Sequence, residues 1–442
     1  MTDELSPAER YTAARLRAAE EATALAPFRE MYDFELDPFQ IEACKALEAG
    51  KGVLVAAPTG SGKTIVGEFA VHLALTQGRK CFYTTPIKAL SNQKYTDLVK
   101  RYGADRVGLL TGDNSINSEA PVVVMTTEVL RNMLYAGSQS LLGLGYVVMD
   151  EVHYLSDRFR GAVWEEVIIH LPESVTLVSL SATVSNAEEF GDWLDTVRGD
   201  TEVIVSEHRP VPLWQHVLAG RRMYDLFEEK SGQGDGQVGR REVNPDLVRL
   251  ARMENTRPSF GRDKRRGRNN MREADRERER RQRSRIWTPG RPEVIERLDA
   301  EGLLPAITFI FSRAGCEAAV QQCLYAGLRL NDEAARARVR SIVEERTSGI
   351  PDEDLHVLGY FEWLEGLERG IAAHHAGMLP TFKEVVEELF VRGLVKAVFA
   401  TETLALGINM PARSVVLEKL VKWNGEQHAD ITPGEYTQLT GR

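Results

Sequence analysis

The sequence has few cysteines, no long apolar run and no apolar leader. Its four cysteines are scattered without a C-x-x-C pair, so they predict neither a disulfide framework nor a zinc site. No apolar run is long enough to cross a membrane, so we expect no membrane partner. The first 34 residues are polar and charged, without the apolar core of a secretory signal. Together these absences predict a cytoplasmic protein.

The net charge is −10, which by itself argues against nucleic-acid binding. The positive charge is concentrated, however: from Arg257 to Arg291 there are fourteen Lys or Arg and five Asp or Glu. This segment has almost no apolar residues, cannot bury a core and is expected to be mobile. Such a run would attract a phosphate backbone in a salt-dependent way. A solvated linker with Arg and Glu paired four residues apart explains the same composition.

The stretch 57–64, with the sequence APTGSGKT, is the strongest chemical signal in the chain. It follows the apolar run 52–56, a predicted strand, and precedes a predicted helix. A strand, a glycine-rich turn and a helix start form an anion site, because backbone N–H groups and the helix dipole point at phosphates. Gly60 and Gly62 allow the backbone to turn and to approach those phosphates closely. We call residues 57–64 the phosphate loop.

Within the phosphate loop, Lys63 is expected to reach the β- and γ-phosphates of ATP, and the Thr64 hydroxyl to help hold Mg²⁺. The usual pattern begins with glycine, and here Ala57 takes that position. The remaining candidate ATP-binding residues of the loop are Pro58, Thr59, Gly60, Ser61 and Gly62.

A candidate adenine contact precedes the phosphate loop. Gln40 opens a predicted helix about twenty residues earlier, and its planar amide has both donors and acceptors for an adenine edge. We also count Phe34 among the candidate ATP-binding residues. A lone glutamine is more commonly just a surface side chain. The position of Gln40 ahead of the phosphate loop favours the adenine contact.

Strands and helices alternate through the first half of the chain. Apolar strands are predicted at 81–85, 107–110, 122–125, 146–149 and 176–180, each followed by polar residues or a helix. This alternation predicts an α/β fold with a parallel sheet and ligands at the carboxyl ends of the strands. The polar residues at those ends also suit helix capping, which uses the same backbone N–H groups.

Two carboxylates follow the predicted strand 146–149. Buried carboxylates are costly unless they meet a cation or water, and in a phosphate-loop protein that cation is Mg²⁺. Asp150 is expected to hold Mg²⁺, and Glu151 to polarise the attacking water. His153, two residues further, is a candidate for coupling this site to its neighbours by hydrogen bonds, and is not expected to bind a metal.

At this point the sequence resembles the first RecA-like domain of superfamily-two helicases. The resemblance is carried by Gln40, APTGSGKT, TPIKALSNQK, DEVH and SAT, in that order. The second half resembles the second RecA-like domain, through HHAG and ATETLALGINMP, and is similar to the superkiller-type DExH-box helicases of RNA decay. The resemblance implies an ATP-dependent RNA helicase core with ATP and Mg²⁺. It also implies an RNA-degrading nuclease as partner.

The same resemblance implies further site residues. Gly407 and Asn409 are expected to contact ATP and the first domain, and Arg442 is expected to contact ATP. The expected nucleic-acid contacts are Pro86, Lys88, Thr111, Gly112, Thr127, Ser312, Arg313, His375 and Thr401. The motifs do not separate RNA from DNA, so a DNA helicase of the related repair branch is the alternative.

The expected organisation is two tandem RecA-like domains, each a parallel sheet flanked by helices. Residues 1–33 are a helical extension, 34–215 the first domain, 216–300 a flexible basic linker and 301–442 an incomplete second domain. The family's last motif is Q-x-x-G-R-x-G-R, and the sequence stops at the first arginine, Arg442. We therefore expect a piece of a longer protein that hydrolyses ATP slowly, or an ATP-binding nucleic-acid clamp that does not unwind.

Overall fold

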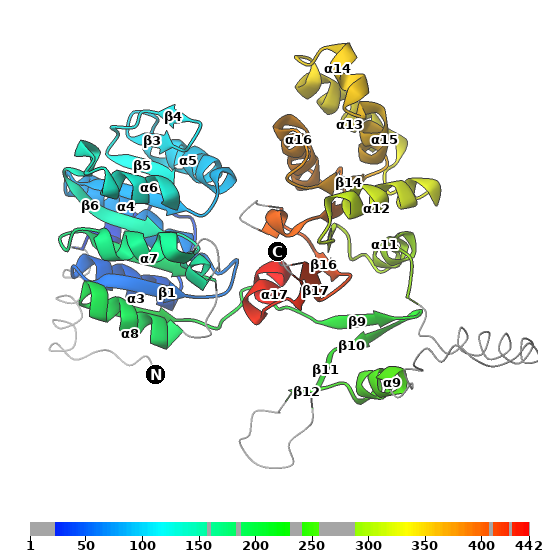
Figure 1. The fold of residues 1–442 in the computed structure, drawn as a ribbon, viewed down its shortest axis with the longest axis horizontal. Coiled ribbons are helices and arrows are strands. Elements are labelled where there is room, and N and C mark those ends of the chain that lie inside the picture. The colour runs from blue at the N-terminus through cyan, green and yellow to red at the C-terminus, as the bar shows by residue number, and fades with distance from the viewer. Residues whose placement is uncertain are drawn as a thin grey trace, which may run out of the picture.

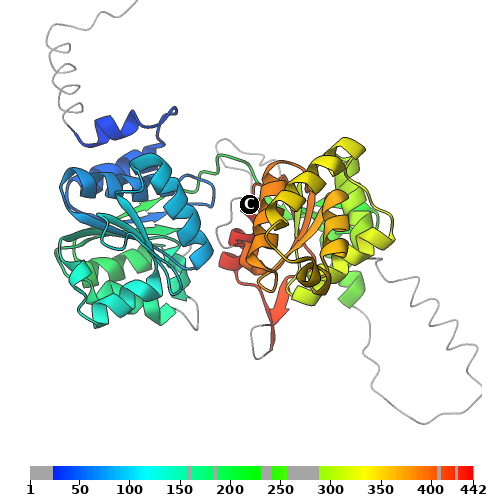
Figure 2. The same cartoon turned by 90° about the horizontal axis from the view of Figure 1, so that it is seen from above.

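The computed structural model describes residues 23–156, 161–182, 187–229, 241–255, 288–405, 410–423 and 427–441. They form two α/β bodies that lie side by side, each built around its own sheet (Figures 1 and 2). The predicted α/β class with two parallel sheets is confirmed. Among the described residues, no helix combines the length and the apolar character needed to cross a membrane.

The first body contains a sheet of eight strands in the order β4-β3-β5-β2-β6-β7-β1-β8. All neighbours pair in parallel except β3 and β4. The strands are β1 (Gly52–Ala56), β2 (Lys80–Thr85), β3 (Val107–Leu110), β4 (Ser115–Ile116), β5 (Val122–Thr126), β6 (Leu144–Met149), β7 (Thr176–Ser181) and β8 (Thr201–Val205). The carboxyl ends of the parallel strands share one edge, which carries the predicted site residues.

Alternating side chains of this sheet enter two separate cores. Val53 and Val55 pack in one core, while Leu54 between them packs in the other. The first core is covered by α2 (Leu25–Arg29), α3 (Pro38–Glu48), α4 (Thr64–Thr76) and α5 (Lys88–Tyr102). The second is covered by α6 (Thr127–Tyr135), α7 (Gly161–His170) and α8 (Ala187–Arg198). Short 3₁₀ turns lie at Gln139–Leu141 and Val152–Ser156.

The second body has a parallel sheet of four strands in the order β14-β15-β13-β16. These strands are β13 (Ala306–Phe309), β14 (Ile371–His374), β15 (Ala397–Ala400) and β16 (Ser414–Leu417). One face packs on α11 (Arg291–Ala300) and α12 (Arg313–Tyr325). The other packs on α13 (Glu333–Thr347), α15 (Tyr360–Glu368), α16 (Pro380–Val391) and α17 (Pro433–Thr440).

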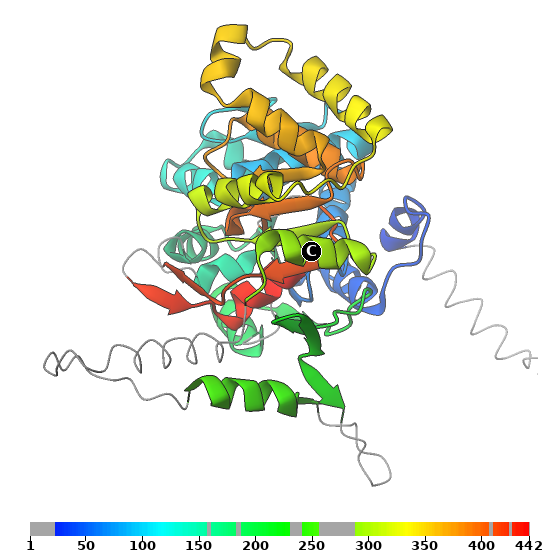
Figure 3. The same cartoon turned by 90° about the vertical axis from the view of Figure 1, so that its right-hand side faces the viewer.

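Two smaller sets of strands complete the described chain. Between the bodies run β9 (His216–Ala219), β10 (Arg222–Asp225), β11 (Phe227–Glu229), β12 (Arg241–Val243) and helix α9 (Pro245–Asn255), which project below the second body (Figure 3). After β16 come β17 (Val421–Trp423) and β18 (His428–Asp430), an antiparallel pair. A 3₁₀ turn spans Glu402–Ala405.

The packing differs from the predicted boundaries at both ends of the linker. Phe28 is fully buried in the core of the first body, although it precedes residue 34. Ile295 and Leu298 of α11 are buried in the second body, although they precede residue 301. Parts of the predicted linker also form β9 to β12 and α9. Most of the basic run, residues 257–287, lies outside the described residues.

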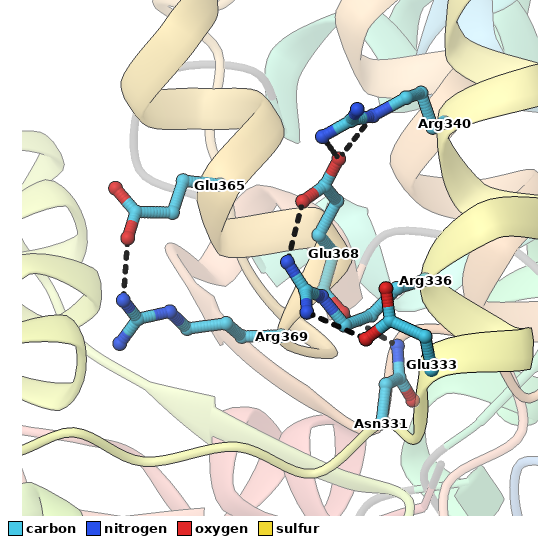
Figure 4. A network of polar contacts seen from close by, with 7 residues as sticks. All are labelled: Asn331, Glu333, Arg336, Arg340, Glu365, Glu368 and Arg369. Carbon is cyan, nitrogen blue, oxygen red and sulfur yellow. Dashed lines mark hydrogen bonds and ion pairs between the residues drawn. The ribbon is translucent and has the colours of Figure 1, made fainter.

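Three helices are inserted between α12 and β14 in the described chain. They are α13, α14 (Asp352–Val357) and α15. A buried carboxylate joins them: Glu368, at the end of α15, accepts hydrogen bonds from Arg340 at 2.7 Å and from Arg336 at 3.3 Å (Figure 4). The Asn331 side chain donates a hydrogen bond to the backbone carbonyl oxygen of Glu368. The inserted helices are therefore tied to the residues that lead into β14.

Candidate nucleotide and nucleic-acid site

The phosphate loop connects the carboxyl end of β1 to the first residue of α4. Gly60 and Gly62 have φ angles of 82° and 81°, in the left-handed region that favours glycine. A Cβ on Gly62 would lie 2.6 Å from the Gln40 amide nitrogen, so only glycine lets the two segments approach this closely. The predicted roles of both glycines therefore have a geometric basis.

Lys63 folds back onto its own loop. Its ammonium donates to the carbonyl oxygens of Ala57, at 2.7 Å, and Pro58, at 2.9 Å. Burial lowers the pKa of Lys63, while the negative charges of Glu151 and Asp150 act in the opposite direction. The lysine therefore lies within the electrostatic reach of both carboxylates, at the point where phosphate charge would be neutralised.

Two loop hydroxyls fit the oxygens of a phosphate. Thr59 Oγ1 and Ser61 Oγ are buried, and neither has a hydrogen-bond partner within the described part of the chain. A buried polar atom without a partner is costly, and phosphate oxygens would accept hydrogen bonds from both. Thr64 is half-buried at the start of α4, where the helix dipole favours an anion.

The Gln40 side chain is hydrogen-bonded to the phosphate loop in this structure. Its amide nitrogen donates to the carbonyl oxygens of Gly62, at 3.0 Å, and Ser61, at 3.3 Å. Its amide oxygen accepts from the backbone N–H of Asp37, as part of a capping box at the start of α3. Gln40 thus positions the loop, and its contact with adenine stays a prediction. Phe34 is 57% exposed and therefore available for stacking.

Asp150 follows β6 with both oxygens oriented. Oδ1 accepts the backbone N–H of Glu151 at 3.0 Å, and Oδ2 accepts the hydroxyl of Tyr83 at 3.0 Å. Burial and the charge of Glu151 raise the pKa of Asp150. A cation would relieve that cost, and Mg²⁺ prefers oxygen ligands from one or two carboxylates together with phosphates. Asp150 and the Thr64 hydroxyl fit this requirement.

Glu151 adopts an unusual backbone conformation, with a φ angle of 54°. Its Oε2 is buried and makes no hydrogen bond within the described residues, while His153 Nδ1 lies 3.4 Å away. Burial lowers the pKa of His153 to about 4, so its imidazole is neutral at neutral pH. A carboxylate without a hydrogen bond on this oxygen has the chemistry to accept a proton from water.

The expected nucleic-acid contacts of the first body gather at the carboxyl ends of β2, β3 and β5. Lys88, the first residue of α5, forms an ion pair of 2.9 Å with Asp113. Thr111 donates to the same carboxylate at 3.1 Å, and Gly112 lies beside Lys88. Since β3, β5 and β2 are neighbours in the sheet, this cluster occupies the half of the edge away from the phosphate loop.

Two expected contacts in this region are buried. Pro86 is buried, and Thr127 is fully buried with its hydroxyl donating to the Thr85 carbonyl oxygen at 3.3 Å. The Thr127 side chain therefore joins two strand ends and does not face a ligand. The nucleic-acid contacts expected of Pro86 and Thr127 stay predictions.

The second body brings its expected contacts together at one sheet edge. Ser312 caps α12 by accepting the backbone N–H of Gly315, and the adjacent Arg313 is exposed. His375 is buried and pairs with Glu317 at 2.7 Å. The backbone N–H of Thr401, just after β15, donates to the carbonyl oxygen of His374, the last residue of β14. Arg313 is therefore the clearest candidate for a direct phosphate contact among these residues.

The end of α17 lies at the phosphate loop. A Cβ built on Gly441 would lie 2.9 Å from Thr59 Cβ, so the second body contacts the loop directly. Near the other end of α17, the Tyr436 hydroxyl donates to Gln215 Oε1 at 2.6 Å. Gly407, Asn409 and Arg442 lie outside the described residues, and their ATP contacts stay predictions.

Sequence reasoning missed three residues of this site. Tyr83 was counted only as part of a strand, while Gln215 and Tyr436 lie in no recognised motif. A tyrosine in an otherwise apolar buried strand is a usable signal, because a buried hydroxyl needs a partner. Nothing in the sequence pairs Gln215 with Tyr436, which are 221 residues apart.

Comparison with known proteins agrees with this geometry. Residues 37–190 match the sequence model of the DEAD/DEAH box helicase family. This part of the chain is therefore similar to a DEAD/DEAH box helicase domain. That range includes Gln40, the phosphate loop and the DEVH stretch of Asp150 to His153, which together line one end of the first sheet.

Relatives extend the similarity to nearly the whole chain. The Mycobacterium tuberculosis protein named probable helicase HelY is 65% identical over 96% of this chain and 45% of its own length. The Arabidopsis thaliana chloroplastic DExH-box ATP-dependent RNA helicase DExH15 is 41% identical over 93% of this chain and 36% of its own length. Superkiller complex protein 2 of Mus musculus is 38% identical over 92% of this chain and 32% of its own length. The chain thus spans less than half of each of these relatives.

Proposed function

We propose that this chain is the ATP-driven core of an RNA helicase, with ATP between the two bodies and RNA across both sheet edges. The observation that carries the proposal is the contact of Gly441, in the second body, with Thr59 of the phosphate loop, at the sheet edge where Asp150 and Glu151 follow β6. That arrangement surrounds one phosphate-binding loop with two carboxylates and the second body. It therefore links phosphate chemistry to the relative position of the bodies.

The residues have distinct roles in this proposal. Lys63 leaves the carbonyl oxygens of its loop and neutralises the β- and γ-phosphates. Asp150 and Thr64 would hold Mg²⁺, which supplies charge neutralisation at the phosphates. The Glu151 carboxylate accepts the proton of the attacking water. Loss of the γ-phosphate weakens the contact between the phosphate loop and α17. The bodies then separate, and their contacts with RNA change.

RNA is the proposed strand because of a named relative, and the two bodies offer a single strand basic residues at both sheet edges. The relative named DExH15 is printed as an RNA helicase and is 41% identical to this chain. The exposed Lys88 and Arg313 lie at corresponding sheet edges of the two bodies, where a single strand could contact both. The DNA alternative is not favoured by the named relatives. The superkiller resemblance adds an RNA-degrading nuclease as the proposed partner.

Two variants test the ATP chemistry. Binding of a fluorescent ATP analogue and release of phosphate are measured with the unmodified chain, Lys63→Ala and Glu151→Gln. Lys63→Ala should lose tight nucleotide binding. Glu151→Gln should bind ATP normally while hydrolysis falls by about 10²–10⁴-fold, the range for loss of a general base. Unchanged hydrolysis by Glu151→Gln would contradict the role given to that carboxylate.

A further inference from the structure

Tyr83 is a fully buried tyrosine that contacts a predicted metal ligand. It lies on β2, next to β6, and its hydroxyl donates to Asp150 Oδ2 at 3.0 Å. The pairing of β2 with β6 places Tyr83 opposite Val148, two residues before Asp150. The ring therefore reaches along the sheet face to the end of the neighbouring strand.

Two helices hold the Tyr83 ring in place. On α4, a Cβ at Gly67 would lie 3.0 Å from Tyr83 Cε2, so this helix approaches the ring closely only because it has glycine there. On α5, the Lys94 ammonium lies 5.4 Å from the ring centroid, within the range of a cation–π contact. Lys94 is itself held by the buried Glu68, whose carboxylate lies 3.9 Å away.

The Tyr83 hydroxyl is not needed for core packing. A phenylalanine would fill the same volume on β2, yet the hydroxyl fixes the rotation of the Asp150 carboxylate from the side opposite the Glu151 N–H. Each Asp150 oxygen then has one hydrogen bond and retains a lone pair for a cation. Groups that orient a metal-binding carboxylate in this way tune its affinity for the metal.

We propose that Tyr83 is a positioning residue that orients Asp150 toward Mg²⁺. The inference rests on the proposed function, since it assumes that Asp150 is a Mg²⁺ ligand. Through Lys94, the same ring joins Asp150 to α5, whose first residue is Lys88 of the expected nucleic-acid cluster. Tyr83 thus gives the metal site a direct contact with the helix that leads to that cluster.

The test is Tyr83→Phe, which removes the hydroxyl and keeps the ring. Tyr146→Phe is the matched control, because Tyr146 is also buried on this sheet but its hydroxyl donates to Gln77 at 3.0 Å. Mn²⁺ binding is measured by electron paramagnetic resonance with a non-hydrolysable ATP analogue, and binding of the analogue alone is measured in EDTA. Tyr83→Phe should bind Mn²⁺ about 10-fold more weakly, with the metal-free nucleotide affinity unchanged.

Each outcome has one meaning. Equal Mn²⁺ affinity in Tyr83→Phe and Tyr146→Phe, or tighter binding in the former, would overturn the inference. Equal losses of Mn²⁺ and metal-free nucleotide binding would also overturn it, because they would show a general effect on the loop. If the unmodified chain bound no nucleotide and hydrolysed none, the proposed function itself would fail, independently of Tyr83.

Discussion

The side-chain amide nitrogen of Gln40 donates to the carbonyl oxygen of Gly62 at 3.0 Å. This bond joins the start of α3 to the phosphate loop across 22 residues of sequence. A Cβ on Gly62 would lie 2.6 Å from that nitrogen, so a larger residue at position 62 would disturb this bond. The shape of the loop thus depends on a residue outside it.

Gln40→Glu should weaken nucleotide binding by about 10-fold or more, because it places a carboxylate beside two carbonyl oxygens in a buried position. The measurement is the dissociation constant of a fluorescent ATP analogue. Gln77→Glu is the control, since it keeps the acceptor oxygen that Tyr146 uses and lies away from the loop. Equal affinity in both variants would show that Gln40 does not support the loop.

Gly441→Ala should slow ATP hydrolysis while leaving each body folded. The new Cβ would lie 2.9 Å from Thr59 and 3.1 Å from the Thr437 carbonyl oxygen, so α17 must move away from the phosphate loop. Crowding of this kind typically costs about 1–3 kcal/mol, which corresponds to roughly a 5- to 150-fold effect. The rate of phosphate release at saturating ATP is the measurement.

The matched control for Gly441→Ala is Gly349→Ala. A Cβ on Gly349 would meet no atom within 4 Å, so this variant tests a glycine in open space. Hydrolysis at the same rate in both variants would show that the contact between Gly441 and Thr59 is not needed for turnover.

Stability should fall as the pH drops below about 6.5, in part because of His72. Burial against Phe28 and Phe69 lowers the pKa of His72 below its ordinary value of 6.5. The unfolded chain then binds a proton that the folded chain resists, so stability is present above pH 6.5 and is lost on acidification. Melting temperatures at pH 7.5, 6.5 and 5.5 should decline less steeply in His72→Leu. An identical slope in both proteins would exclude this contribution.

Glu368→Gln should lower the free energy of unfolding of the second body by about 1–3 kcal/mol, because it weakens charged hydrogen bonds to a buried side chain. Glu368 is 5% exposed and is contacted by Arg336 and Arg340 (Figure 4). Urea unfolding followed by circular dichroism measures the change. Glu365→Gln is the control, because its pair with Arg369 is exposed and should contribute about 0–1 kcal/mol. Equal losses in the two variants would contradict the proposed anchoring of the insertion.

Much of the fold could be predicted because its strands are apolar runs followed by chemically distinctive ends. Val147 and Val148, for example, belong to a short apolar run that ends just before Asp150, and its length and β-branched residues favour a strand. The boundaries could not be predicted, since the burial of Phe28 and Ile295 depends on helices packing onto distant strands. Short edge strands such as β4, with two residues, have no pattern to detect.

The site was predicted unevenly for a similar reason. The loop and the carboxylates carry local motifs, so Lys63, Asp150 and Glu151 could be assigned from neighbouring residues. Contacts between side chains far apart in sequence, such as Tyr83 with Asp150, depend on strand order and register. Thr127 was expected to contact nucleic acid, and the burial of its side chain follows from the neighbouring strand end, which no local pattern predicts.

The most direct measurement is the rate of ATP hydrolysis with no nucleic acid, with single-stranded RNA and with single-stranded DNA of the same sequence. It is made at low and moderate salt, with Lys63→Ala as the blank. The account predicts hydrolysis that RNA stimulates more strongly than DNA at both salt concentrations. Hydrolysis that neither strand changes, or that DNA alone stimulates, would contradict an ATP-driven core that acts on RNA.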